Sequence, residues 1–282
     1  MIDYKELYDC LFQVSKQAGA LALKLQNGIV NEGKQVETII GEDLRHKAMR
    51  EAKTKADEMV QELFLTALKE KYRTLLSLDV EEETELVKAF SNTSYDISFI
   101  LDPIDGTLEY LEQKDSYSIC SAILSQGDVK LAIVYFPAKD VLYGYCEGMP
   151  PKEYHRVMDM QPCMGEELCG KRKEHAPLTV YKNARLAKQY IERLQEKGYV
   201  VLDDQEEERN CPQVLLECLY GRALACFCDT RNIRDILLGA ILSKTMYGAA
   251  YDYSGNRLVW QPYGRQKEAV FSIYPKELLF PL

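Results

Sequence analysis

Two aspartates lie three residues apart on one bend of the chain, directly after an apolar run. The stretch is FILDPIDGTLEYL (residues 99–111), in which Asp102 and Asp105 flank a Pro-Ile pair. Proline fixes its own φ, and Gly106 permits backbone angles that other residues resist. The bend can therefore direct both carboxylates, and the Ile104 carbonyl, to one side. Such close carboxylates repel each other unless a cation separates them, and hard oxygen ligands favour Mg²⁺, Mn²⁺ or Ca²⁺.

An alternative interpretation needs no metal: the bend is an Asp-Pro turn whose acids cap the following segment, TLEYLEQ. Two further acidic features favour the metal site. A run of glutamates at 81–83 follows a predicted strand, and Asp235 begins a predicted apolar helix. Each feature alone has an ordinary explanation, as a solvated face or a helix cap. Together they predict a site for divalent cations.

The elements that must position these residues alternate irregularly between helix and strand. Apolar spacing and short apolar runs indicate the elements, and Gly127-Asp128 indicates a hairpin. Residues 28–50 are predicted to be a loop and 148–177 an irregular connection. We expect helices at 4–27, 57–71, 184–197, 214–220 and 235–247, and strands at 74–80, 96–102, 116–124, 129–137, 140–147, 178–183, 199–204, 223–229 and 269–275.

This pattern predicts an α/β layered fold with mixed sheets, not a doubly wound one. We expect two units along the chain. Residues 1–140 form an N-terminal α+β domain that carries most of the metal ligands. Residues 141–282 form a C-terminal α/β domain that carries Asp235 and the residues on the substrate side.

Composition narrows the class of function. A net charge of −9 argues against binding of a nucleic acid polymer, and no GxGxxG or GxxxxGK[ST] loop is present. The N-terminus has no apolar leader, and no run approaches the roughly 18 apolar residues of a membrane span, so a cytoplasmic protein is expected. The nine cysteines are odd in number and lack CxxC spacing, which favours reduced thiols. A small-molecule substrate is the remaining expectation.

The chain resembles the inositol monophosphatase superfamily of magnesium-dependent, lithium-sensitive phosphatases. Four motifs carry the resemblance in the family's order, which are TKAD (54–57), VEEET (80–84), DPIDGT (102–107) and RDILLG (234–239). It covers most of the chain, and DPIDGT is its most specific motif. Within the superfamily the sequence is most similar to the 3′(2′),5′-bisphosphate nucleotidases, because DGTLEY keeps their glutamate as Glu109. LAIVYFPAKDVLYGYCEG and NIRDILLG also resemble segments of those enzymes.

The resemblance implies an αβαβα sandwich and a site for two or three Mg²⁺ ions, with Mn²⁺ as a substitute and inhibition by Li⁺. The implied metal ligands are Glu82, Asp102, the Ile104 carbonyl, Asp105 and Asp235. The implied catalytic residues are Asp57, Glu82 and Thr107, and the implied phosphate- or substrate-binding residues are Gly106, Thr107 and Asp235.

The implied reaction is metal-assisted hydrolysis of a small phosphate monoester, such as the 3′-phosphate of 3′-phosphoadenosine 5′-phosphate. Thr107, supported by Asp57, would orient the attacking water. A homodimer is the implied assembly, and no membrane span is expected. The absence of a Ser-His or Cys-His signature agrees with hydrolysis that needs no covalent intermediate.

Departures from the family pattern leave the substrate open. Arg234 and Leu237-Leu238 replace a tryptophan and two alanines of the family. Glu81 replaces a glycine before the glutamate pair, so the metal-binding glutamate is open among residues 81–83. The family's substrate-side segments lack clear counterparts, and Arg231 or Arg234 is a candidate for phosphate contact. The alternatives are an inositol or sugar phosphate phosphatase, and a member that has lost catalysis and binds a metal or ligand.

Overall fold

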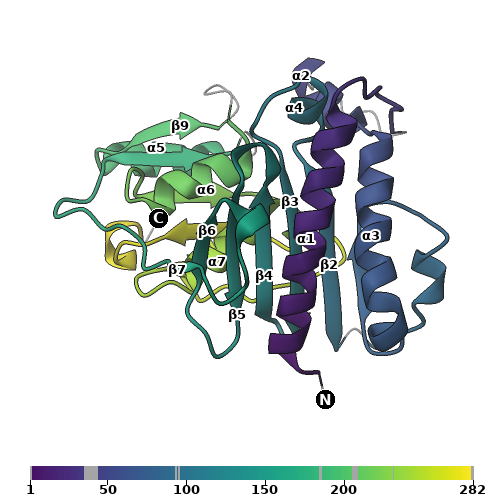
Figure 1. The fold of residues 1–282 in the computed structure, drawn as a ribbon. Coiled ribbons are helices and arrows are strands. Elements are labelled where there is room, and N and C mark those ends of the chain that lie inside the picture. The colour runs from purple at the N-terminus through teal and green to yellow at the C-terminus, as the bar shows by residue number, and fades with distance from the viewer. Residues whose placement is uncertain are drawn as a thin grey trace.

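Two mixed β-sheets and three groups of helices alternate in layers (Figure 1). The computed structural model describes residues 2–34, 44–92, 94, 96–183, 186–204, 209–230 and 232–280. None of the helices in these ranges is both long and apolar enough to cross a membrane.

The first sheet has seven strands whose spatial order follows the chain. They are β1 (Ser77–Val80), β2 (Ile97–Asp105), β3 (Ser118–Ser125), β4 (Asp128–Phe136), β5 (Val141–Cys146), β6 (Lys152–His155) and β7 (Glu166–Glu167). β1 is parallel to β2, and every later pair is antiparallel. The β3–β4 turn uses Gln126 and Gly127, both with positive φ, as a tight hairpin turn requires. Asp128 is therefore the first residue of β4, not part of the turn as predicted.

The second sheet has five strands in the order β11-β12-β10-β8-β9. They are β8 (Thr179–Lys182), β9 (Val200–Asp203), β10 (Ala225–Cys228), β11 (Ala249–Tyr251) and β12 (Ala269–Ser272). β10, β8 and β9 are mutually parallel, and β12 is antiparallel to both of its neighbours. Both sheets are therefore mixed.

Helices cover both faces of each sheet. The helices are α1 (Tyr4–Gln26), α2 (Leu44–Glu51), α3 (Lys55–Tyr72), α4 (Thr107–Leu111), α5 (Lys188–Glu196), α6 (Cys211–Leu219) and α7 (Leu237–Ser243). α1 and α3 lie on the outer face of the first sheet, and α6 and α7 lie between the sheets (Figure 1). α5 lies on the outer face of the second sheet, where Tyr190 packs on Tyr253, which in turn contacts Phe227 of β10.

The central strands alternate between two hydrophobic cores. Phe99 and Leu101 of β2 pack with α1 and α3, whereas Ile100 between them packs with α6 and α7. A strand that is covered on both faces has a continuous apolar run, which is the pattern of residues 99–101. The residues at the end of β2 are consequently held by a rigid strand.

The predicted layered α/β fold with mixed sheets is confirmed, with local differences. Residues 44–51 form α2 where a loop was expected, because this short polar helix has no apolar stripe that periodicity can detect. Residues 148–177 supply β6 and β7. The helix predicted at 235–247 begins as a 3₁₀ turn, η4 (Ile233–Ile236), and α7 ends at Ser243. β5 to β7 extend the first sheet beyond residue 140, and the division into two domains there stays a prediction.

Candidate active site

Acidic residues from distant parts of the chain meet where β1 and β2 end. The parallel register pairs Val80 with Leu101, so the residues that follow β1 lie beside Asp102. Burial is the main cause that raises the pKa of Asp102, and Glu81, Asp105 and Asp235 are close enough for their charges to raise it further. The structure therefore brings the bend of residues 102–107 together with the glutamate run and with η4.

Asp57 and Thr107 meet beside this bend. Thr54 caps α3, and its backbone N–H and Oγ1 donate to Asp57 Oδ2 at 2.8 and 2.7 Å. Thr107 Oγ1 lies 3.2 Å from Asp57 Oδ1 and 2.9 Å from the Ile104 carbonyl oxygen. Burial raises the pKa of Asp57 to about 6, against the opposing hydrogen bonds from Thr54. The geometry allows the predicted pairing of a hydroxyl with a carboxylate.

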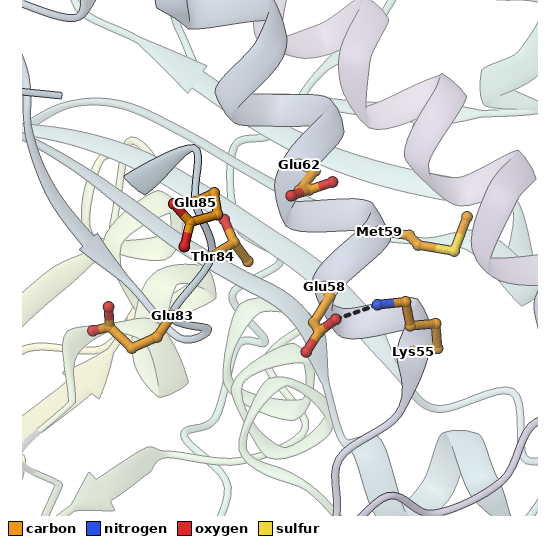
Figure 2. Close-up of a pocket in the computed structure, with 7 residues that line it drawn as sticks. All are labelled: Lys55, Glu58, Met59, Glu62, Glu83, Thr84 and Glu85. Atoms are coloured by element: carbon orange, nitrogen blue, oxygen red, sulfur yellow. Dashed lines mark hydrogen bonds and ion pairs between the residues drawn. The ribbon is translucent and has the colours of Figure 1, made fainter. Parts of the chain in front are cut away.

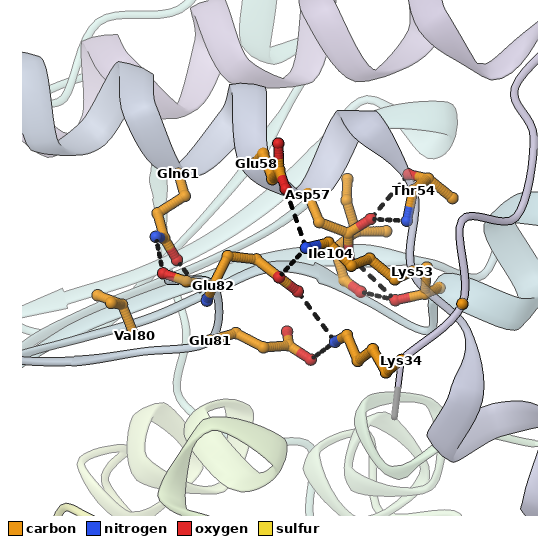
Figure 3. Close-up of polar contacts among 12 residues, drawn as sticks. Lys34, Lys53, Thr54, Asp57, Glu58, Gln61, Val80, Glu81, Glu82 and Ile104 are labelled. Carbon is orange, nitrogen blue, oxygen red and sulfur yellow. Dashed lines mark hydrogen bonds and ion pairs between the residues drawn. The ribbon is translucent and has the colours of Figure 1, made fainter. Parts of the chain in front are cut away.

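Glu81 and Glu82 both point toward Asp57. One carboxylate oxygen of each of these three residues lies within 4.8 Å of the other two. Gln61 fixes the backbone of Glu82, because the Glu82 N–H donates to Gln61 Oε1 at 2.9 Å (Figure 3). Glu83 is exposed and lines a different pocket. Glu81 was not among the predicted metal ligands. The sequence indicated it only because the metal-binding glutamate was left open among residues 81–83.

Two lysines neutralise part of this cluster. Lys34 forms ion pairs with Glu81 and Glu82, and Lys53 Nζ lies 2.8 Å from Glu82 and 2.9 Å from Glu58 (Figure 3). Neither lysine was predicted to lie at the site, because no spacing rule connects a lysine to a carboxylate some 30 to 50 residues away. The carboxylate of Glu82 is thus held between two cationic side chains.

Buried acceptor atoms in the bend fit a cation. Asp102 Oδ1 and Glu81 Oε2 are buried, and within the described ranges neither has a hydrogen-bond partner. Burial first, and then neighbouring charges, hold the pKa values of Asp102 and Asp105 well above their usual range. The donor set consists of carboxylates with the Ile104 carbonyl, which suits Mg²⁺. The residues therefore fit the magnesium that the family motif implies.

Gly106 is required at this bend. Its φ is +88°, and an added Cβ would lie 3.3 Å from Glu109 Oε2 and 3.4 Å from Asn210 Nδ2. Asn210 caps α6, and its Nδ2 donates to the Ser116 carbonyl at 2.8 Å. The start of α6 consequently lies against the bend and helps to fix its shape.

Asp235 approaches from η4 and is held by Thr230, whose Oγ1 donates to Asp235 Oδ2 at 2.7 Å. The neighbouring Arg234, a candidate for phosphate contact, instead lies on β1, with Nη1 2.7 Å from Asp79 Oδ1. Arg231, the other candidate, falls outside the described residues. The bulk of residues 237–238 is accommodated in the core between the sheets, where both leucines are buried.

A surface pocket beside the acidic cluster contains Glu83, one of the three glutamates left open as the metal ligand, but no other residue predicted for the site (Figure 2). It is lined by Lys55, Glu58, Met59, Glu62, Glu83, Thr84 and Glu85. This pocket is therefore not the predicted metal site around Asp102 and Asp105.

We expect Lys53→Met to strengthen divalent metal binding, because Lys53 competes with a metal for Glu82. The gain should be roughly threefold to tenfold, about 1 kcal/mol for a partly exposed ion pair. Calorimetric titration with Mn²⁺ measures it. Lys55→Met is the matched control, since Lys55 pairs with Glu58 but has no ion pair with Glu82. Weaker binding by the Lys53 variant would show that this lysine supports the site.

Comparison with known proteins gives the family context. The model of the inositol monophosphatase family matches residues 3–193. The chain is 24% identical over 167 residues to the 3′(2′),5′-bisphosphate nucleotidase CysQ of Shigella flexneri, a match that covers 58% of this chain and 62% of CysQ. It is 23% identical over 117 residues to the Nus factor SuhB of Escherichia coli K12, a match that covers 41% of each chain. The chain thus spans less than two thirds of the length of these curated relatives.

Solved structures share the fold over nearly the whole chain. An IMPase/NADP phosphatase complexed with Mg²⁺ and phosphate has a TM-score of 0.70 at 16% identity, and the match covers 99% of this chain and 95% of that one. An IMPase from Thermotoga maritima has a TM-score of 0.65 at 18% identity, with 97% and 95% covered. At these identities the likeness establishes the fold alone.

Proposed function

The chain belongs to the inositol monophosphatase family, and we propose that it is a magnesium-dependent phosphatase of small phosphate monoesters. The observation that carries the proposal is the convergence of the Glu81 and Glu82 carboxylates on Asp57, which Thr107 contacts. The predicted ligands Glu82, Asp102, the Ile104 carbonyl, Asp105 and Asp235 would hold the ions, with Glu81 as an additional ligand. Mn²⁺ as a substitute, inhibition by Li⁺ and a homodimer belong to the same proposal.

The residues around the bend have distinct parts in the proposed reaction. Bound magnesium would supply a water of lowered pKa and charge that neutralises the phosphate. Thr107 would orient that water through its hydroxyl. Asp57, with a pKa of about 6, is ionised at neutral pH and can accept a hydrogen bond from Thr107 or a proton. Gly106 and Thr107 would bind phosphate oxygens through their backbone N–H groups, and Asp235 would face the substrate.

For the substrate, we propose the 3′-phosphate of 3′-phosphoadenosine 5′-phosphate. Two features support this choice, which are Glu109 in the DGTLEY motif and the similarity to CysQ over 58% of the chain. An inositol phosphate or a sugar phosphate is the alternative substrate. A member without catalysis is the alternative function, and the close approach of the Asp57, Glu81 and Glu82 carboxylates is the observation against it.

A substrate panel tests the proposal. Phosphate release is measured with 3′-phosphoadenosine 5′-phosphate, inositol 1-phosphate and hexose phosphates, with millimolar Mg²⁺ and with EDTA. We expect release that requires Mg²⁺ and has the highest kcat/KM for the bisphosphate nucleotide. Faster hydrolysis of another ester would overturn the proposed substrate but would still support the proposed phosphatase activity. Ligand that binds and returns unchanged from every reaction would support the binding protein instead.

A further inference from the structure

A largely buried ion pair joins η4 to β1 next to the acidic site. Arg234 Nη1 lies 2.7 Å from Asp79 Oδ1 and 3.0 Å from the Val80 carbonyl oxygen. The side chains of Arg234 and Asp79 are 17% and 8% exposed. Arg234 directly precedes Asp235, and Val80 directly precedes Glu81. One guanidinium therefore links the backbone segment that carries Asp235 to the segment that carries Glu81.

The second oxygen of Asp79 anchors another segment. The backbone N–H of Tyr263 donates to Asp79 Oδ2 at 2.6 Å, and Tyr263 has a φ of 61°, which is rare for an aromatic residue. The Tyr263 hydroxyl donates to Ser77 Oγ at 2.6 Å. The carboxylate of Asp79 thus holds β1 against two separate parts of the C-terminal half.

The contacts suit positioning better than they suit stability. A buried ion pair is weak evidence for stability, because desolvation offsets most of its attraction. Its geometry, however, is well defined, since Nη1 contacts a carboxylate and a carbonyl at once. Arg234 is also near enough to Asp102 for its charge to favour the ionised carboxylate.

We propose that the Arg234–Asp79 pair is a positioning device that holds Asp235 at a fixed distance from Glu81 and Glu82. The proposal rests on the function proposed above only in assuming that these carboxylates bind a divalent cation. Neither member of the pair needs to touch substrate. Without the pair, η4 loses its polar attachment to β1, and the carboxylates on the two segments no longer converge on one ion.

The test measures Mn²⁺ binding by calorimetry in Arg234→Met, Asp79→Asn and the double variant. We expect each single variant to bind Mn²⁺ roughly tenfold to 100-fold more weakly, the usual effect of losing a group that orients metal ligands. The double variant should bind no more weakly than the worse single variant, because both changes break one link. Where phosphate release is measurable, kcat should fall with little change in KM.

Lys244→Met is the matched control. Lys244 Nζ lies 2.6 Å from Asp128 Oδ1, with side chains 12% and 39% exposed, so this pair also joins the helices between the sheets to the first sheet. It lies at the far end of that sheet, where Ser125 pairs with Ile97, whereas Asp102 pairs with Cys120 at the other end. We expect Mn²⁺ affinity to be unchanged in this control.

The outcomes separate this proposal from the proposed function. Wild-type Mn²⁺ affinity in Arg234→Met, or an equal loss in Lys244→Met, would overturn the positioning role even if the enzyme hydrolyses phosphate esters. Weaker Mn²⁺ binding confined to the Arg234 and Asp79 variants would support it even if no ester is hydrolysed. If Arg234→Met does not fold, Arg234→Lys keeps the charge but loses the planar fork. That variant should bind Mn²⁺ several-fold more weakly, and wild-type affinity in it would count against the proposal.

Discussion

Asp105→Asn is expected to abolish phosphate release, with a fall in kcat/KM of ~10³-fold or more, since loss of a group that merely supports a ligand already costs 10- to 100-fold. Asp105 Oδ2 accepts a hydrogen bond from Ser118 Oγ at 3.1 Å, and burial, followed by the charge of Asp235, raises the pKa of Asp105. The amide keeps the size of the side chain and removes the charge that a divalent cation needs. Steady-state phosphate release with saturating Mg²⁺ measures the loss.

Asp115→Asn is the matched control for this experiment. It makes the same chemical change ten residues further along the chain, at a side chain that is 70% exposed. Its turnover should equal that of the wild type. Asp105→Asn should also unfold no more easily than wild type without metal, because an amide removes a buried carboxyl whose ionisation is unfavourable. Near wild-type turnover in Asp105→Asn would exclude Asp105 from the site.

Local sequence was sufficient to predict the bend at the end of β2. The structure differs from the prediction in form, because Asp102, Ile104 and Asp105 are the last residues of β2 and not a separate turn. The pairing of β2 with β3 shifts register between Asp102 and Asp105, and the chain turns at Gly106. The neighbouring glutamates were also predictable as a cluster, because they directly follow a short apolar strand. Features confined to a few adjacent residues thus predicted where the chain turns.

Long-range pairing could not be predicted. Arg234 and Asp79 are 155 residues apart, and only the fold shows that they form an ion pair. Which glutamates of residues 81–83 face the site depends on the direction in which the chain leaves β1. A shift of one residue there would turn a different glutamate toward Asp57. The contacts of Lys34 and Lys53 likewise depend on the positions of the segments that follow α1 and α2. Polar partners across the fold leave no periodic signal in the sequence, unlike apolar faces.

The metal-free protein is expected to lose stability as the pH rises from about 4 to about 7. Burial raises the pKa of Asp57 in the folded state from 3.8 to about 6, and it raises those of Asp102 and Asp105 well above their usual range. The folded state then binds more protons than the unfolded state, so stability falls as the pH rises through this window. Asp57 alone accounts for about 3 kcal/mol, at about 1.4 kcal/mol per pKa unit.

Asp57→Asn isolates this contribution. Urea unfolding in EDTA, measured at a series of pH values, should give a flatter pH dependence for the variant than for the wild type. The comparison is needed because other carboxylates act in the opposite direction: ion pairs lower the pKa values of Glu58 and Glu217. Parallel curves for the two proteins would show that Asp57 is ionised equally easily in the folded and unfolded states.

Mg²⁺ is expected to reverse the loss of stability at neutral pH and to have little effect near pH 4. Protons and the cation compete for the same buried oxygens, so the ion binds best once the carboxyls have ionised. An ion that binds only the folded state adds about 2.7 kcal/mol to the free energy of unfolding when its free concentration is 100 times the dissociation constant. The increase in the free energy of unfolding that Mg²⁺ produces should therefore grow with pH. It should grow more steeply than for an ion bound by exposed carboxylates. An increment that is constant with pH would mean that the cation binds somewhere other than the buried bend of Asp102 and Asp105.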